Sequence, residues 1–120
     1  MQTLYSKIGP ENLKAIIDGF YDLVFANEKI GHLFKTDQAL VREKQYQFLT
    51  QFLGGPQLYS ANYGHPKMRM RHLPHRIDSD SRDEWLNLMR ESIYEVLEDK
   101  RLAEELYNCF PKLANHMVNR

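Results

Sequence analysis

This 120-residue sequence lacks several features, and each absence excludes a class of protein. Its single cysteine, Cys109, cannot form an internal disulfide, which is typical of a reducing compartment. No apolar run approaches the roughly 18 residues of a membrane-spanning helix, and we expect no signal peptide, because the first residues show no charged lead and long apolar run. The 16 basic residues balance 16 acidic ones, so no overall field attracts nucleic acid or a membrane surface. We therefore expect a cytoplasmic protein with neither kind of partner.

Strands are also missing, because no segment alternates apolar and polar residues over strand length. The sequence instead predicts an all-α fold in a single domain, 1–120. We expect helices over 10–27, from 36 or 37 up to Gly54-Gly55-Pro56, over 81–97 and over 102–118. A short turn over 30–34 and a loop over 57–66 complete the prediction. Ser81 and Glu84 have the spacing of a capping box, and Pro111 is expected to kink the last helix.

Each predicted helix carries an apolar stripe with helical spacing. The members are Leu13, Ile16, Ile17, Phe20, Leu23 and Val24; Val41, Phe48, Leu49 and Phe52; Trp85, Leu88, Met89, Ile93, Val96 and Leu97; and Leu106, Cys109, Phe110, Leu113 and Met117. Three polar side chains, Tyr21, Gln45 and Trp85, interrupt stripes on three different helices. Each is explained either as a core residue bonded to a backbone carbonyl or as part of an apolar pocket for a polar small molecule.

The segment 67–76 alternates basic residues with methionine, leads into His72 and is stopped by Pro74. A helix this short has little stability of its own. Alone, the segment is most simply a basic surface turn. The alternative is a segment held by haem, with His72 on the iron and basic neighbours on the propionates.

Other site chemistries find no support. No two of the five histidines have the spacing of a helical zinc site, and one cysteine cannot form a thiolate cluster. The sequence has neither a glycine-rich phosphate loop nor a nucleophile elbow. Asp80, Asp83 and Glu84 are better explained as helix-start residues than as catalytic carboxylates.

A series of motifs in one order spans nearly the whole chain. It comprises Phe20-Tyr21, Phe34, Gln45-x-x-Phe48-Leu49, Gly54-Gly55-Pro56-x-Leu58-Tyr59, Gly64-His65-Pro66, Arg69-x-Arg71-His72-x-Pro74-x-x-Ile77, Trp85 and His116-Met117. The series resembles the truncated haemoglobins of the second group. The resemblance implies a two-over-two helical sandwich that encloses a b-type haem. Pro111 departs from what we associate with the group.

The resemblance also implies roles for individual residues. His72 would be the proximal ligand of the haem iron. Tyr21, Gln45 and Trp85 would surround the bound gas, with the apolar Val41 at the position of a distal gate. The remaining cofactor contacts would be Phe34, which stacks on the porphyrin, Tyr59 and Arg71 on the propionates, and Phe48, Tyr63 and Arg69.

These roles predict a protein that binds dioxygen and other small diatomic gases at a five-coordinate haem iron. Donors from Tyr21 and Trp85 would hold dioxygen tightly, which suits sensing, scavenging or redox chemistry more than bulk oxygen transport. One alternative is a haem enzyme with peroxidase or nitric-oxide dioxygenase activity, which needs a reductase that the sequence does not reveal. Another is an all-α interaction module without haem, whose basic segment binds an anionic partner. We expect a monomer or a weak homodimer.

Overall fold

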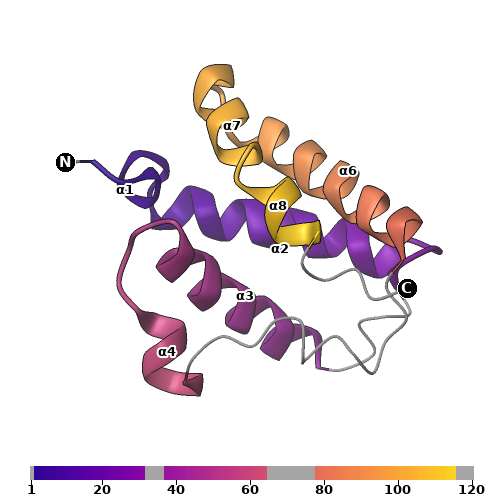
Figure 1. Cartoon of the computed structure of the whole chain (residues 1–120), viewed down its shortest axis with the longest axis horizontal. Helices are drawn as coiled ribbons and strands as arrows, with labels where there is room; N and C mark the ends of the chain where they lie inside the picture. Colours follow the sequence, from indigo (N-terminus) through magenta and orange to yellow (C-terminus); the bar gives the residue numbers. More distant parts are fainter. Residues whose placement is uncertain (1, 32–36, 65–77, 116–120) are drawn as a thin grey trace.

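The computed structural model describes residues 2–31, 37–64 and 78–115. These residues form α-helices and no strand, which confirms the all-α prediction (Figure 1). The helices are α1 (Leu4–Ile8), α2 (Pro10–Ala26), α3 (Gln38–Phe52), α4 (Leu58–Tyr63), α6 (Ser79–Val96), α7 (Lys100–Tyr107) and α8 (Phe110–Asn115). None of them is both long and apolar enough to cross a membrane.

The start of α2 follows the sequence prediction. Pro10 occupies the first turn, where its missing N–H leaves no hydrogen bond unmade. Gly9 precedes it with φ of 85°, a conformation that favours glycine. The sequence did not predict α1, which has only five residues and begins where the Thr3 hydroxyl accepts from the Ser6 N–H at 3.0 Å. A helix of this length is too short to show apolar periodicity.

Aspartates begin the two long helices after α2. Asp37 accepts from the Leu40 N–H at 3.2 Å and caps α3, at one of the two predicted start positions of that helix. In α6 the cap is Asp78, which accepts from the Ser81 N–H at 2.8 Å. The predicted capping box at Ser81 is therefore wrong, because Ser81 already lies inside the first turn. An aspartate three residues upstream satisfies the same kind of free N–H group.

Two further predictions are wrong. The segment predicted as a loop contains α4, a six-residue helix whose apolar residues do not form a long enough pattern to signal it. The last helix is not one kinked rod, since α7 ends at Tyr107 and α8 begins at Phe110. Pro111 lies in the first turn of α8, where proline is tolerated, so the chain breaks before it and does not bend around it. The final residues of the predicted helix, 116–120, lie outside the described part of the chain.

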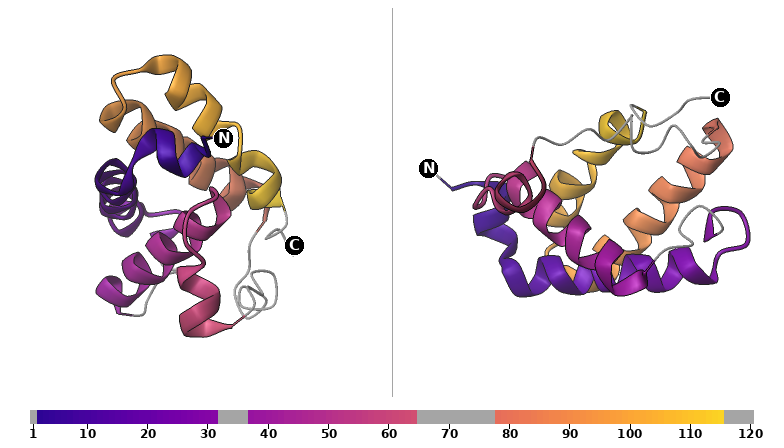
Figure 2. Two further views of the ribbon diagram at one scale, coloured as in Figure 1. Left: turned by 90° about the vertical axis from the view of Figure 1, so that its left-hand side faces the viewer. Right: turned by 90° about the horizontal axis from the view of Figure 1, so that it is seen from below.

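The helices form two layers of two, the arrangement that the resemblance implied. One layer pairs α2 with α3, and the other pairs α6 with the consecutive segments α7 and α8, which together stand for one helix (Figures 1 and 2). The layers meet where α2 packs on α6, and α4 extends the first layer by packing on α3. At the crossing, Gly19 allows a close approach, and the buried Ser92 hydroxyl donates to the Ile16 carbonyl at 2.6 Å. This contact sets the relative position of α2 and α6.

Candidate functional site

Two of the predicted distal residues come together around one phenylalanine. The Phe20 ring lies 4.9 Å from the Tyr21 ring and 5.1 Å from the Trp85 ring, edge-on to both. Tyr21 and Trp85 are buried, on α2 and α6 respectively. Although Tyr21 and Trp85 are widely separated in the sequence, the Tyr21 hydroxyl and the Trp85 indole N–H therefore belong to one aromatic cluster. On its other side, the Trp85 ring lies 5.9 Å from Phe110 of α8.

The environment of Tyr21 keeps its hydroxyl protonated. Burial raises the pKa of this phenol well above its ordinary value, and the nearby Arg42 charge only partly opposes the rise. The hydroxyl consequently carries its proton at neutral and moderately alkaline pH. Tyr21 can therefore serve as a hydrogen-bond donor over that range.

The stripe predicted to face inward on α3 is only partly buried. Phe48 is buried, while Val41 and Gln45 are half-buried. Phe52 is 44% exposed, so its predicted burial is wrong, and its ring stacks beside Phe48 at 5.8 Å. Leu49, another member of the stripe, is fully buried, as is the adjacent Thr50. The stripe thus leaves apolar surface open beside a glutamine amide.

The helix α4 brings two tyrosines to this stripe. Tyr59 is buried and lies edge-on to Phe48 at 5.8 Å, and Tyr63 lies 5.1 Å from Tyr59. The Lys44 ammonium group lies 5.0 Å from the centre of the Tyr63 ring. Three of the predicted cofactor contacts, Phe48, Tyr59 and Tyr63, therefore form one aromatic cluster.

The remaining predicted site residues, Phe34, Arg69, Arg71 and His72, lie outside the described residues. The same is true of the other four histidines. Among residues 2–31, 37–64 and 78–115, no three His, Cys, Asp or Glu side chains are arranged to hold a metal ion.

The sequence analysis missed Arg42. Its guanidinium group bonds to Asp18 and Asp22 of α2 and lies 5.6 Å from the Phe25 ring, which stacks on Tyr21. The signal in the sequence was the pair of aspartates four residues apart, which lie on one face of α2. No periodicity argument links that pair to a particular arginine.

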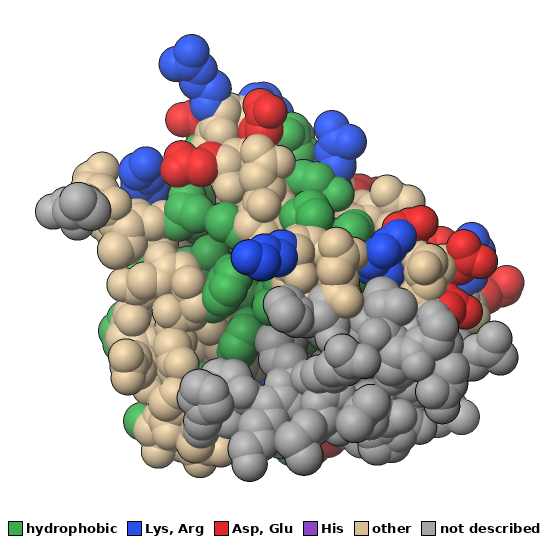
Figure 3. Space-filling view, in the orientation of Figure 1, with side chains coloured by type: hydrophobic (Ala, Val, Ile, Leu, Met, Phe, Trp, Pro, Cys, Tyr) green, Lys and Arg blue, Asp and Glu red, His purple; other side chains and the backbone are tan. Residues whose placement is uncertain are grey.

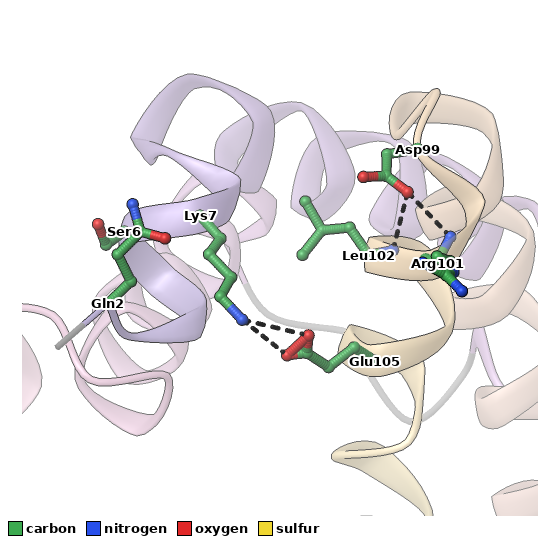
Figure 4. A pocket seen from close by; sticks show the side chains of 7 residues that line it. All are labelled: Gln2, Ser6, Lys7, Asp99, Arg101, Leu102 and Glu105. Carbon is green, nitrogen blue, oxygen red and sulfur yellow. Dashed lines mark hydrogen bonds and ion pairs between the residues drawn. The ribbon is translucent and has the colours of Figure 1, made fainter.

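Polar cavities lie elsewhere on the molecule. One, of about 440 Å³, separates α1 from the start of α7 and is crossed by the Lys7–Glu105 ion pair at 3.3 Å (Figure 4). Asp99 caps α7 at its edge by accepting from the Arg101 and Leu102 N–H groups. None of the predicted site residues that the structure describes lines this cavity. On the face shown in Figure 3, hydrophobic side chains form a strip below the charged upper edge of the molecule.

The sequence of residues 3–119 matches the family model of the bacterial-like globins. The chain belongs to this family. A group 2 truncated haemoglobin from Bacillus subtilis, YjbI, is 39% identical over 116 residues, which cover 97% of this chain and 88% of that protein. The globin described here is thus a truncated haemoglobin of the second group, and the predicted family is confirmed.

Solved structures agree with this assignment. A truncated oxygen-avid haemoglobin from Bacillus subtilis, 38% identical, superposes with a TM-score of 0.92 over 98% of this chain and 100% of that chain. The group II truncated haemoglobin from Bacillus anthracis, 33% identical, gives a TM-score of 0.93 over 99% and 98%. Two variants of the latter, with one tryptophan changed to leucine or one tyrosine to alanine, give the same score. The two-over-two globin fold is confirmed.

Membership of the family implies a haem cofactor and the binding of small diatomic ligands such as oxygen. The described residues fit that cofactor. A flat apolar ring system needs an open apolar face, which the α3 stripe from Val41 to Phe52 offers. A bound gas needs donors that are shielded from water, which Tyr21 and Trp85 offer.

Proposed function

We propose that this globin binds dioxygen tightly at a five-coordinate b-type haem held by His72. Tyr21, Gln45 and Trp85 form the hydrogen-bonding distal side, and Val41 stands at the gate. Phe34, Phe48, Tyr59, Tyr63, Arg69 and Arg71 contact the cofactor. Such a site serves sensing, scavenging or redox chemistry better than bulk transport.

The observation that carries the proposal is the burial of Tyr21 and Trp85, both in ring contact with Phe20. Burial brings a tyrosine hydroxyl and an indole N–H into an apolar interior, where such groups usually bond to a polar atom. The two positions altered in the Bacillus anthracis variants are separated by the same number of residues as Tyr21 and Trp85. That spacing supports an equivalent pair of functional residues in the two proteins.

When bound, haem supplies an iron atom with a coordination position for a diatomic gas. The contribution of the chain is to hold and protect that gas. A dioxygen molecule held there would carry partial negative charge, and hydrogen bonds to a charged acceptor contribute about 1.5–3 kcal/mol each. Tyr21 can donate such a bond because its phenol stays protonated, and Trp85 because its indole N–H is always a donor.

Further support concerns the type of haem. Attachment of a c-type haem uses two cysteines in a C-x-x-C-H motif. The chain has only Cys109, so the cofactor would be held by coordination and packing, as in a b-type haem.

The test compares oxygen dissociation in Tyr21→Phe and Trp85→Phe by stopped-flow ligand replacement. Each change keeps most of the ring and removes the polar hydrogen. Losing one charge-assisted bond corresponds to a rate increase of roughly ten- to a hundredfold. Carbon monoxide is a poorer acceptor, so its dissociation should change less.

Tyr94→Phe is the matched control. Tyr94 is half-buried on α6, and the guanidinium carbon of Arg90 lies 5.2 Å from the centre of the Tyr94 ring. Loss of the Tyr94 hydroxyl should therefore leave oxygen dissociation unchanged. If oxygen leaves Tyr21→Phe and Trp85→Phe at the wild-type rate, both residues are core packing and the proposal fails.

A further inference from the structure

Arg42 joins α2 and α3, two of the three helices that carry the proposed distal residues. From α3, its Nη1 donates to the Asp18 carbonyl oxygen of α2 at 2.8 Å and lies 3.4 Å from Asp18 Oδ1. Its Nη2 donates to Asp22 Oδ1 at 2.8 Å. The Arg42 side chain is only 23% exposed, and its guanidinium carbon lies 5.6 Å from the centre of the Phe25 ring. The planar guanidinium group thus donates hydrogen bonds to the two aspartates through its N–H groups and makes a cation–π contact with the Phe25 ring.

The three partners of Arg42 flank one residue, Tyr21, along α2. Along α2, Asp18 precedes Tyr21 by three positions, Asp22 follows it directly, and Phe25 lies one turn beyond. The Phe25 ring stacks on the Tyr21 ring at 5.6 Å with an interplanar angle of 28°. The guanidinium group, the Phe25 ring and the Tyr21 ring therefore follow one another from the surface into the core.

Arg42 also belongs to the distal segment of α3. It follows Val41 and precedes Gln45 by three residues. Beside it, a cavity of about 420 Å³ separates α2 from α3 and is lined by Ile17, Asp18, Arg42 and Tyr46 among others. Arg42 lines this cavity and bridges it through its bonds to Asp18 and Asp22.

We propose that Arg42 is a positioning residue for Tyr21, which it holds in place through Phe25 and through the two aspartates on α2. This inference rests on the proposed distal role of Tyr21. Arg42 touches neither haem nor gas in this scheme. It restricts the Tyr21 ring and the separation of α2 from α3, so that the hydroxyl meets the bound dioxygen in one geometry. Hydrogen bonds weaken steeply with misalignment, so a small freedom of the ring is enough to lose much of the bond.

The principal test is a double-mutant cycle of Arg42→Gln and Tyr21→Phe, read as oxygen dissociation rates. In the wild-type background we expect Arg42→Gln to speed oxygen dissociation about three- to tenfold, a fraction of a full charge-assisted bond. In the Tyr21→Phe background it should have no further effect, because the hydroxyl that it positions is gone. Carbon monoxide dissociation should stay near the wild-type value in both backgrounds.

A second readout does not depend on oxygen. Protein labelled with 3-fluorotyrosine, in its carbon monoxide form, gives fluorine resonances for its seven tyrosines, and the Tyr21 resonance is the one lost in Tyr21→Phe. Arg42→Gln should shift or broaden this resonance. The matched control is Lys7→Gln, which breaks an ion pair between α1 and α7 far from Tyr21 and should leave it in place.

The outcomes separate the two proposals. If Tyr21→Phe alone leaves oxygen dissociation unchanged, the distal role of Tyr21 fails. If Tyr21→Phe speeds it while Arg42→Gln does not, or if Arg42→Gln acts equally in both backgrounds, Arg42 only joins helices and the inference is overturned. Should Arg42→Gln fold poorly, Asp22→Ala is the substitute, because it removes one acceptor from a side chain that is 71% exposed. It should act in the same direction, and an unchanged rate and resonance would count equally against the inference.

Discussion

The crossing of α2 and α6 allows a sharp test of how the two layers are held together. A Cβ atom on Gly19 would lie 2.8 Å from Ser92 Oγ, a separation that Cβ atoms do not tolerate. The Ser92 hydroxyl cannot rotate away freely, because it donates to the Ile16 carbonyl at 2.6 Å in a buried position. We therefore predict that Gly19→Ala and Ser92→Ala have strongly coupled effects on stability.

The magnitudes follow from the contacts. Ser92→Ala removes one buried hydrogen bond, worth about 0.5–1.5 kcal/mol. Gly19→Ala overpacks the crossing at a cost of about 1–3 kcal/mol, offset by about 1 kcal/mol of helix propensity. In Ser92→Ala the clashing oxygen is gone, and the next atom, Ser92 Cβ, is 3.9 Å away. Gly19→Ala should then stabilise the protein by about 1 kcal/mol, so its effect changes from unfavourable or neutral to favourable.

The coupling is measured by a double-mutant cycle of the wild type, Gly19→Ala, Ser92→Ala and the double variant. The four haem-loaded proteins are unfolded in urea while far-ultraviolet circular dichroism and haem absorbance are followed together. The slope m should stay constant, so that shifts in midpoint report stability. Equal effects of Gly19→Ala in both backgrounds would show that the helices do not approach as closely as described, and the reasoning would be wrong. A favourable effect in the wild-type background would have the same meaning.

Three further predictions concern the site and its supports. His72→Ala should purify largely without haem, which absorption spectra would show, whereas full haem occupancy with an unchanged spectrum would refute the proximal assignment. Above about pH 10 an unfolded tyrosine loses its proton, while buried Tyr21 keeps it. The contribution of Tyr21 to the free energy of unfolding is therefore complete below that pH and falls by up to about 1.4 kcal/mol per pH unit above it. Unfolding of Tyr21→Phe between about pH 10 and 11 should therefore be less sensitive to pH than that of the wild type. Asp99→Ala removes the cap that accepts from two N–H groups of α7 and should cost about 0.5–2 kcal/mol in thermal unfolding, with Glu98→Ala, an exposed neighbour, as its control.

The sequence by itself determined the class of the fold and its family. Apolar spacing is a local property, so the helices around Phe20, Phe48 and Met89 were predictable from neighbours along the chain. The order of motifs from Phe20-Tyr21 to Trp85 was specific enough to indicate the family. Local patterns also failed where an element was short, as in α4, or where an upstream aspartate, Asp78, replaced the predicted Ser81 as a helix cap.

Only the tertiary structure decided which residues meet. That the Phe20 ring meets Trp85 as well as its neighbour Tyr21 depends on how α2 crosses α6, and no pattern within either helix encodes that crossing. The same is true of Arg42, whose partners lie on another helix. The tertiary structure also decided the break between α7 and α8. The chain turns just before Pro111, so that this proline lies in the first turn of α8, where it is tolerated. Periodicity determines which face of a helix is apolar, but the packing of one helix on another decides what that face contacts.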